Sequence, residues 1–320
     1  MHRTHPIAIA LSIVVAAFAT AGGSKEALPR EINVSFVESP FNVQVMVMKE
    51  KGLLEKAFAE KGVAVKWHNI NSGAHQTEAM AAGSLDIASV VNTTSVILAN
   101  AAGNRVEVAA LVSRPKQAFA LLVGGEGPRT VSELKGKTIA GPKGTVLHQM
   151  LVAALASEGL SVKDVSFVSM GLPESRTALL SGKVDGALQA ASLIIRGEEA
   201  GLRTLLTADG YLTPLLVTAV RPAFAEKHPE LLDLYLKAQA EAAEWSLSHE
   251  AEAIAIGSKI HGIGEADGKK LYDWNDMASV MTQEDLAAME VDVAFLLDQG
   301  MIRSRVAAKD FVLDVAFNVR

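Results

Sequence analysis

The sequence contains no cysteine among its 320 residues. This absence excludes disulfide bonds, thiolate metal sites, iron–sulfur clusters, cysteine nucleophiles and a lipidated cysteine as a membrane anchor. Aromatic residues make up only 5% of the chain, so we expect cores built mainly from Ala, Val, Leu and Ile. Hydrophobic residues at 49% and charged residues at 21% are typical of globular chains, which excludes a largely disordered protein.

Signatures of catalysis and of nucleic-acid binding are also missing. The formal net charge is −6 and Lys and Arg form no cluster, so we expect no nucleic-acid partner. The histidines form no paired zinc motif, and there is no Gly-x-Ser-x-Gly elbow. The glycine-rich runs 124–127 and 141–145 lack the spacing of dinucleotide and phosphate loops. We therefore expect no catalytic residue, no metal site and no cofactor.

Residues 1–21 have the features of a secretory signal peptide. Arg3 precedes an apolar run over residues 7–18, and residues 19–21 read Ala-Thr-Ala, a small-x-small cleavage sequence. The run is shorter than the roughly 20 residues that span a bilayer, and no later segment is long and apolar enough. We predict cleavage after Ala21. Because no cysteine can carry a lipid, we expect the mature protein to be soluble in the periplasm.

Two series of alternating strands and helices follow. The first has expected strands at 32–36, 63–70, 85–91 and 106–112, with helices at 46–61, 76–82 and 93–102. The second has expected strands at 118–123, 137–140, 165–169 and 184–188, with helices at 130–134, 144–158 and 173–181. Such alternation predicts an α/β fold with largely parallel sheets. Further helices are expected at 228–245, 250–260, 282–299 and 306–316.

Two short segments of the chain resemble each other. In both 82–88 and 181–187, a glycine that follows a helix precedes an apolar-Asp-x-Ala strand. Glycine suits the left-handed turn that ends a helix, and such units are common in α/β proteins. The similarity also fits two lobes built on the same plan.

Small and hydroxyl residues gather where strands are expected to pass into helices. In open α/β sheets these junctions face the crevice where ligands bind, and a helix start favours an anion. Ser, Thr and Asn are also ordinary helix caps, and a histidine just inside a helix can be a surface residue, so each position has a simpler interpretation. The candidate ligand-binding residues are Ser39, Asn42, Ser72, Gly73, His75, Asn92, Thr94, Gly144, Thr145, His148 and Ser192.

Four stretches carry a family resemblance. Residues 76–87 contain an Ala-x-Gly-x-x-Asp pattern, and residues 131–140 contain Leu-Lys-Gly-Lys. Residues 143–148 read Lys-Gly-Thr-Val-Leu-His, and residues 225–230 end in His-Pro-Glu. In this order the patterns resemble those of the bacterial solute-binding proteins that serve aliphatic sulfonate, taurine and nitrate ABC importers.

That resemblance implies a two-lobe periplasmic-binding-protein architecture of type II. Lobe 1 would comprise residues 31–115 and 216–320, with the C-terminal helices packed on it, and lobe 2 would comprise residues 116–215. The crossing segments would lie near 114–119 and 213–220. The family often has an aromatic residue and Asp-Pro after the strand expected at 184–188. Here residues 190–195 contain neither, which indicates a roomier or differently lined pocket.

The resemblance and the export signal predict a solute-binding component of an ABC importer, not an enzyme. It would capture a small organic anion, sulfonate- or carboxylate-like, between two closing lobes. The charged head would lie at Ser72-Gly73 and Gly144-Thr145. The expected partners are this solute and, transiently, a membrane ABC permease, and the protein itself is expected to be a monomer.

The alternative is a two-lobe enzyme of the thiamine-pyrimidine or menaquinone-biosynthesis type. Such enzymes are cytoplasmic, so the export signal disfavours them. The pyrimidine synthases also rely on a cysteine-rich segment, which this chain lacks.

Overall fold

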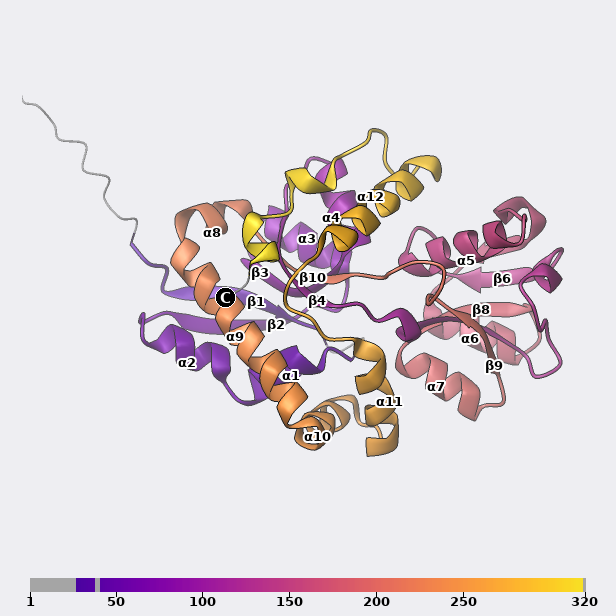
Figure 1. Ribbon diagram of the computed structural model, residues 1–320, viewed down its shortest axis with the longest axis horizontal. Helices are drawn as coiled ribbons and strands as arrows, with labels where there is room; N and C mark the ends of the chain where they lie inside the picture. The colour runs from indigo at the N-terminus through magenta and orange to yellow at the C-terminus, as the bar shows by residue number, and fades with distance from the viewer. Residues whose placement is uncertain (1–26, 38–40, 319–320) are drawn as a thin grey trace, which may run out of the picture.

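Two mixed sheets, one in each half of an elongated molecule, form the framework of the fold (Figure 1). The computed structural model describes residues 27–37 and 41–318, and the predicted signal peptide lies outside them. The first sheet has the order β2 (Ala64–Asn69), β1 (Glu31–Phe36), β3 (Ile87–Asn92), β10 (Leu216–Val220), β4 (Glu107–Ser113). The second has the order β7 (Ser166–Ser169), β6 (Thr138–Gly141), β8 (Gly186–Ala190), β5 (Phe119–Val123), β9 (Arg203–Thr207).

The chain crosses between the two lobes twice. Each sheet contains one strand that runs against its neighbours after a crossing: β5 is antiparallel to β8 and β9, and β10 is antiparallel to β3 and β4. The crossing segments are residues 114–118 and 208–215, and the N–H of Ala208 donates to the carbonyls of Lys116 (3.1 Å) and Phe119 (3.0 Å). The predicted two-lobe α/β fold is confirmed. The return crossing ends before residue 216, because residues 216–220 already belong to the lobe 1 sheet.

Helices flank both sheets. Lobe 1 carries α1 (Val43–Glu50), α2 (Leu53–Ala59), α3 (Gly73–Ala81) and α4 (Thr93–Ala101). Lobe 2 carries α5 (Val146–Ser157), α6 (Leu172–Leu180) and α7 (Ser192–Glu199). The C-terminal part contributes α8 (Pro222–Lys227), α9 (Pro229–Ser248), α10 (Glu250–His261), α11 (Glu265–Asn275) and α12 (Gln283–Asp298).

The C-terminal helices pack mainly on lobe 1. The apolar stripe of α9 buries Leu231, Tyr235, Ala238 and Ala242 in the same cluster as the interior residues of α1 and α2. Helix α12 packs on α4, where Met289 and Val293 join Val96 and Ile97 in a second cluster. These helices also reach lobe 2, because α11 contacts α7 and α12 contacts α5. The C-terminal part therefore lies against both lobes.

The two similar sequence segments have the same structure. Gly83 and Gly182 both adopt a left-handed φ, +75° and +70°, after α3 and α6. In lobe 1 the backbone N–H of Asn33 donates to Oδ2 of Asp86 at 2.9 Å. In lobe 2 the N–H of Thr138 donates to Oδ2 of Asp185 at 2.8 Å. Each aspartate thus satisfies a strand N–H at the start of the neighbouring strand, where water would otherwise be needed.

One predicted helix is wrong. Residues 306–316 form two short 3-10 turns, Ala308–Asp310 and Asp314–Phe317, instead of an α-helix. Between them, Val312 makes a parallel bridge with Val108 of β4, and the N–H of Leu313 donates to the carbonyl of Val108. The segment therefore satisfies its backbone at the edge of the lobe 1 sheet, and tertiary pairing overrides its helical spacing.

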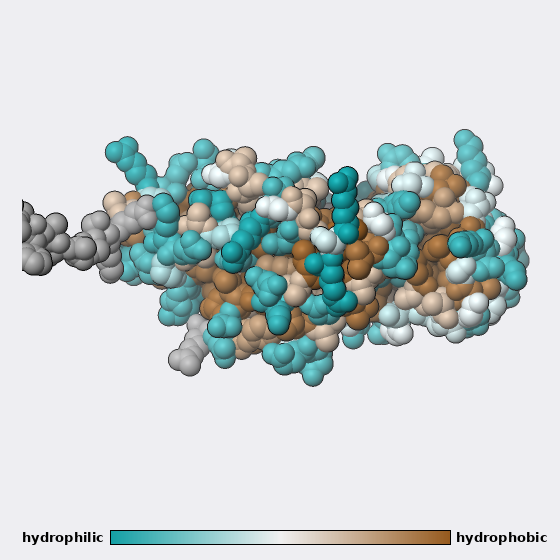
Figure 2. Space-filling model, turned by 90° about the horizontal axis from the view of Figure 1, so that it is seen from above, coloured by the Kyte–Doolittle hydropathy of each residue, from teal (hydrophilic) through white to brown (hydrophobic). Residues whose placement is uncertain are grey.

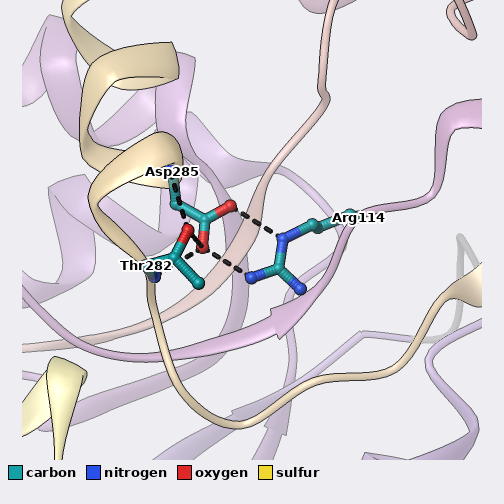
Figure 3. A network of polar contacts seen from close by, with 3 residues as sticks. All are labelled: Arg114, Thr282 and Asp285. Atoms are coloured by element: carbon teal, nitrogen blue, oxygen red, sulfur yellow. Dashed lines mark hydrogen bonds and ion pairs between the residues drawn. The ribbon is translucent and has the colours of Figure 1, made fainter.

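An ion pair fixes the first crossing segment to α12 (Figure 3). Arg114 donates from Nε to Oδ1 of Asp285 at 2.7 Å and from Nη2 to Oδ2 at 2.6 Å. Asp285 also accepts the N–H of Thr282 at 2.8 Å, completing a capping box at the start of α12. Burial alone would raise the pKa of Asp285, but the bonds from Arg114 and Thr282 hold it below its usual value. The carboxylate therefore stabilises both the helix start and the crossing segment.

Replacing this carboxylate should destabilise the fold more than replacing an exposed one. Asp285→Ala leaves Arg114 without its bidentate partner, and we expect a loss of about 3 kcal/mol in the free energy of unfolding. Asp233→Ala removes an exposed pair with Lys237 on α9 and should cost less than about 1 kcal/mol. Urea unfolding of both variants at pH 7 measures the difference, and equal losses would contradict it.

Because the pKa of Asp285 is lowered in the folded state, the free energy of unfolding should depend on pH. The stabilisation is complete above the ordinary pKa of an aspartate and is lost as the pH falls through the lowered value of the folded state.

Candidate functional site

The lobe 1 half of the predicted site is a small hollow at the carboxyl ends of β1 and β3. Gly73 and Asn92 line it together with Val37, Asn71, Gln76, Val90, Val91 and Leu216. The starts of α3 and α4 meet beside this hollow, since a Cβ added to Gly73 would lie only 3.1 Å from Nδ2 of Asn92. Ser72, Gly73 and Asn92 are thus brought together as the sequence predicted. The structure does not describe Ser39.

Some of the polar side chains around this hollow already accept hydrogen bonds as helix caps. Oγ of Ser72 accepts the N–H of His75 at 3.4 Å, and Oδ1 of Asn92 accepts the N–H of Ser95 at 2.8 Å. The capping interpretation therefore holds for both oxygens. The amide Nδ2 of Asn92 remains on the side of Gly73 and can donate to a ligand.

The other lobe 1 candidates differ in exposure. The side chain of His75 is exposed on the first turn of α3, whereas Thr94 is buried in α4. Asn42 is buried at the start of α1, where its carbonyl accepts the N–H groups of Val45 and Met46.

The sequence gives no sign of Gln76 as a member of this site. It is buried on α3, accepts the Ser35 hydroxyl at 2.7 Å and donates to the carbonyl of Val90 at 3.0 Å. These bonds join α3 to β1 and β3 and so shape the floor of the hollow.

In lobe 2, the start of α5 brings Gly144, Thr145 and His148 together. The Thr145 hydroxyl donates to the carbonyl of Pro142 at 2.9 Å, so its proton is used within its own loop. The N–H of Gly144 points at Nδ1 of His148 at 3.3 Å. No side chain of the described residues caps α5. The N–H groups of its first turn, more than the Thr145 hydroxyl, are therefore its donors toward a ligand.

His148 is a packing residue in this structure. Its ring is buried, stacks on Phe167 at a centroid distance of 4.7 Å and meets the edge of Phe295 on α12 at 5.7 Å. Burial, followed by the charge of Lys143, lowers the pKa of His148. The ring therefore favours its neutral form, in which Nδ1 can accept the N–H of Gly144.

The start of α7 is the second lobe 2 element of the site. Ser192 begins the helix, and Ala191 before it has φ +48° and ψ −126°, a conformation that residues other than glycine rarely adopt. Strain of this kind concentrates at functional sites. Ala191 and Ile195 share a hydrophobic cluster with Phe41 and Ile254 of lobe 1, so the start of α7 lies against lobe 1.

Helix α12 and the residues after it cover the start of α5 from the side of lobe 1. A Cβ added to Gly144, which has φ +73°, would overlap the sulfur of Met301. Phe295 packs against His148 as described above. Figure 2 views the molecule from above and shows a notch between the larger and the smaller lobe. Gly144 and His148 of lobe 2 therefore lie where lobe 2 contacts the C-terminal part of lobe 1.

Neither a metal site nor a bilayer-spanning helix is found in the described part of the chain. No three His, Asp or Glu side chains gather there in a way that could hold a metal ion. None of the helices in residues 27–37 and 41–318 has the length and apolarity that a bilayer crossing needs.

Comparison with known proteins places this chain in a family. The model of the NMT1/THI5-like family matches residues 43–253. The chain belongs to this family. It is 30% identical to the taurine-binding periplasmic protein of Escherichia coli over 263 residues, which cover 76% of this chain and 80% of the relative. A Bacillus subtilis protein named for binding aliphatic sulfonates is 28% identical over 274 residues, with coverage of 84% and 82%.

Solved structures show the same fold. The periplasmic aliphatic sulphonate-binding protein SsuA of Escherichia coli superposes with a TM-score of 0.82 at 21% identity, covering 90% of this chain and 93% of its own. A ligand-binding component of an ABC-type import system from Staphylococcus aureus has a TM-score of 0.73 at 12% identity, with coverage of 89% and 97%. The predicted family and fold are thus confirmed.

An enzyme shares this fold as well. The desulfurization enzyme DszB superposes with a TM-score of 0.66 at 14% identity, covering 89% of this chain and 96% of its own. The fold is therefore compatible with catalysis in other chains.

Proposed function

We propose that this protein is the solute-binding component of an ABC importer and holds a small organic anion between its two lobes. The observation that carries the proposal is the set of helix starts at the lobe contact. No side chain of the described residues caps α5 or α7, and the free amide of Asn92 lies at the start of α4. Helix starts supply N–H donors and a positive dipole end, which together suit an anionic head group.

A sulfonate fits these donors better than a carboxylate. Its three oxygens can accept from N–H groups on several helix starts at once, whereas a carboxylate has two. The relatives named for taurine and aliphatic sulfonates support this class. Residues 190–195 contain no aromatic residue, whereas the family often has one in this segment, so we infer that the pocket has room for a substituent larger than that of taurine.

Introducing a negative charge at position 92 tests this proposal. Asn92→Asp keeps an oxygen for the N–H of Ser95, so α4 stays capped, but it replaces the amide donor with a negative charge. We expect at least a tenfold loss of affinity for ethanesulfonate, measured by titration calorimetry, with an unchanged melting temperature without ligand.

The matched control is Asn104→Asp. Asn104 is exposed just beyond the other end of α4, and the substitution adds the same charge away from the hollow. Its affinity should stay within twofold of the parent protein. Equal affinities of the two variants would contradict a head group at Asn92, and binding of neutral compounds alone would contradict an anionic solute.

We also propose that the protein is not an enzyme. The solved structures of DszB include a mutant, with serine in place of one cysteine, in complex with biphenyl-2-sulfinic acid, whereas this chain contains no cysteine. Tight binding of a sulfonate that is recovered intact after long incubation supports a binding protein, and release of sulfite would instead support a desulfurising enzyme.

Export to the periplasm and a monomeric state complete the proposal. The relative from Escherichia coli is named as periplasmic, in agreement with the signal-peptide features of residues 1–21. Intact-mass measurement of protein from a periplasmic extract should give a chain that begins at residue 22. A chain that still begins at Met1 would contradict export, and light scattering of the same sample tests the monomer.

A further inference from the structure

A buried carboxylate on α12 joins the two lobes. Oδ2 of Asp292 accepts a 2.9 Å hydrogen bond from the hydroxyl of Thr93, the first residue of α4 in lobe 1. Oδ1 accepts a 2.8 Å bond from Nε2 of Gln149, on the first turn of α5 in lobe 2. Asp292, Gln149 and Thr93 are all less than a tenth exposed. The carboxylate therefore binds the same two helix starts that the proposed solute uses.

The two hydrogen bonds have different fates when the lobes separate. Helix α12 packs on α4, so the bond to Thr93 stays within lobe 1. Of the two bonds, the one to Gln149 joins the lobes, so separation of the lobes would have to break it and would let water reach the carboxylate. The lobes also meet through an ion pair, in which Nζ of Lys270 lies 2.6 Å from Oε2 of Glu198. Both side chains are more than a third exposed, so this pair contributes little to the free energy that holds the lobes together.

We propose that Asp292 is a positioning residue of the solute site, a latch that holds the start of α5 against lobe 1 and makes closure respond to pH. The proposal rests on the solute-binding function above. Closing buries the carboxylate, and protonation removes the cost of burying its charge. Acidification therefore favours the closed lobes, and an alkaline medium favours opening.

The titration of Asp292 agrees with this direction. Burial raises the pKa of Asp292 from 3.8 to about 6, although the bonds from Gln149 and Thr93 act in the opposite sense. Once the lobes open and water reaches the carboxylate, its pKa should return toward the ordinary value. The closed form then binds a proton more tightly, and closing should become roughly tenfold more favourable between pH 8 and pH 5.

Among the described residues, the elements packed around Asp292 carry few other charged groups, and Lys309 and Asp310 on the turn that packs on α12 are exposed. Helix α4 carries no titratable residue, and α5 carries only His148, which Lys143 precedes. On α12 itself, Asp285 pairs with Arg114 and Glu290 pairs with Arg305, while Glu284 and Asp298 are exposed. His148 titrates in the opposite sense because burial favours its neutral form. Its effect is common to variants of Asp292 and cancels in their ratio.

Asp292→Asn isolates the charge. Its amide can accept from Gln149 and donate to Thr93, so both hydrogen bonds persist without an ionised group. Ethanesulfonate is a suitable probe because it does not titrate between pH 5 and 8. We expect the parent protein to bind it more weakly than Asp292→Asn at pH 8, and the ratio of the parent Kd to the variant Kd to fall roughly tenfold from pH 8 to pH 5. Asp298→Asn, an exposed change on the same helix, should match the parent at both pH values.

A Kd ratio that is the same at pH 5 and pH 8 would overturn the latch. Small-angle scattering without solute keeps the test independent of the proposed function. The radius of gyration of the parent protein should rise from pH 5 to pH 8 more than that of Asp292→Asn, and equal rises would also overturn it. If neither protein binds ethanesulfonate but the scattering differs as expected, the solute assignment fails and the latch stands.

Discussion

The ion pair between Arg114 and Asp285 is the interaction on which the arrangement of the two lobes depends. Arg114 opens the first crossing segment, and its backbone N–H also donates to the carbonyl of Asp276, directly after α11. Asp285 caps α12 while it holds the guanidinium. The first crossing segment and the start of α12 are therefore held together by these hydrogen bonds, and α12 in turn contacts lobe 2.

The contacts of α12 with both the crossing segment and lobe 2 explain why the C-terminal third is more than a cover on lobe 1. Asp292, Phe295 and Met301 follow one another along α12 and the loop after it, and each contacts the start of α5. A solute that binds the start of α5 therefore lies close to side chains of α12 and of the loop after it, and these side chains influence its affinity. Affinity in such a protein reflects the difference in free energy between the open and closed forms as well as direct contacts.

The sequence predicted the alternating elements because their patterns are local. The turns after α3 and α6 needed glycine, and the aspartates that follow them satisfied strand N–H groups in both lobes. The positions of Ser72, Gly73 and Asn92 at helix starts could be predicted because cap residues mark such starts. Asp292 and Gln149 were missed because each is one polar residue within an ordinary amphipathic helix. Their contact depends on the fold, which brings together residues that are far apart in the sequence.

Failures of the prediction have equally physical causes. Residues 306–316 have helical spacing, but the free edge of β4 offered better backbone partners. In the sequence, the segment 190–195 showed only that the family's aromatic residue is missing, and the strained backbone of Ala191 became visible only in three dimensions. All the candidate ligand-binding residues stay predictions, since burial, exposure and position alone do not test contact with a solute.

The central claim is that solute is held between lobes that close on it. Because the chain has no cysteine, Glu78→Cys on α3 and Thr177→Cys on α6 allow two spin labels at exposed positions, one on each lobe. Pulsed electron double resonance then measures the distance between them. Saturating ethanesulfonate should shift the distribution to a single shorter distance. An unchanged distribution in protein shown to bind the solute would contradict closure.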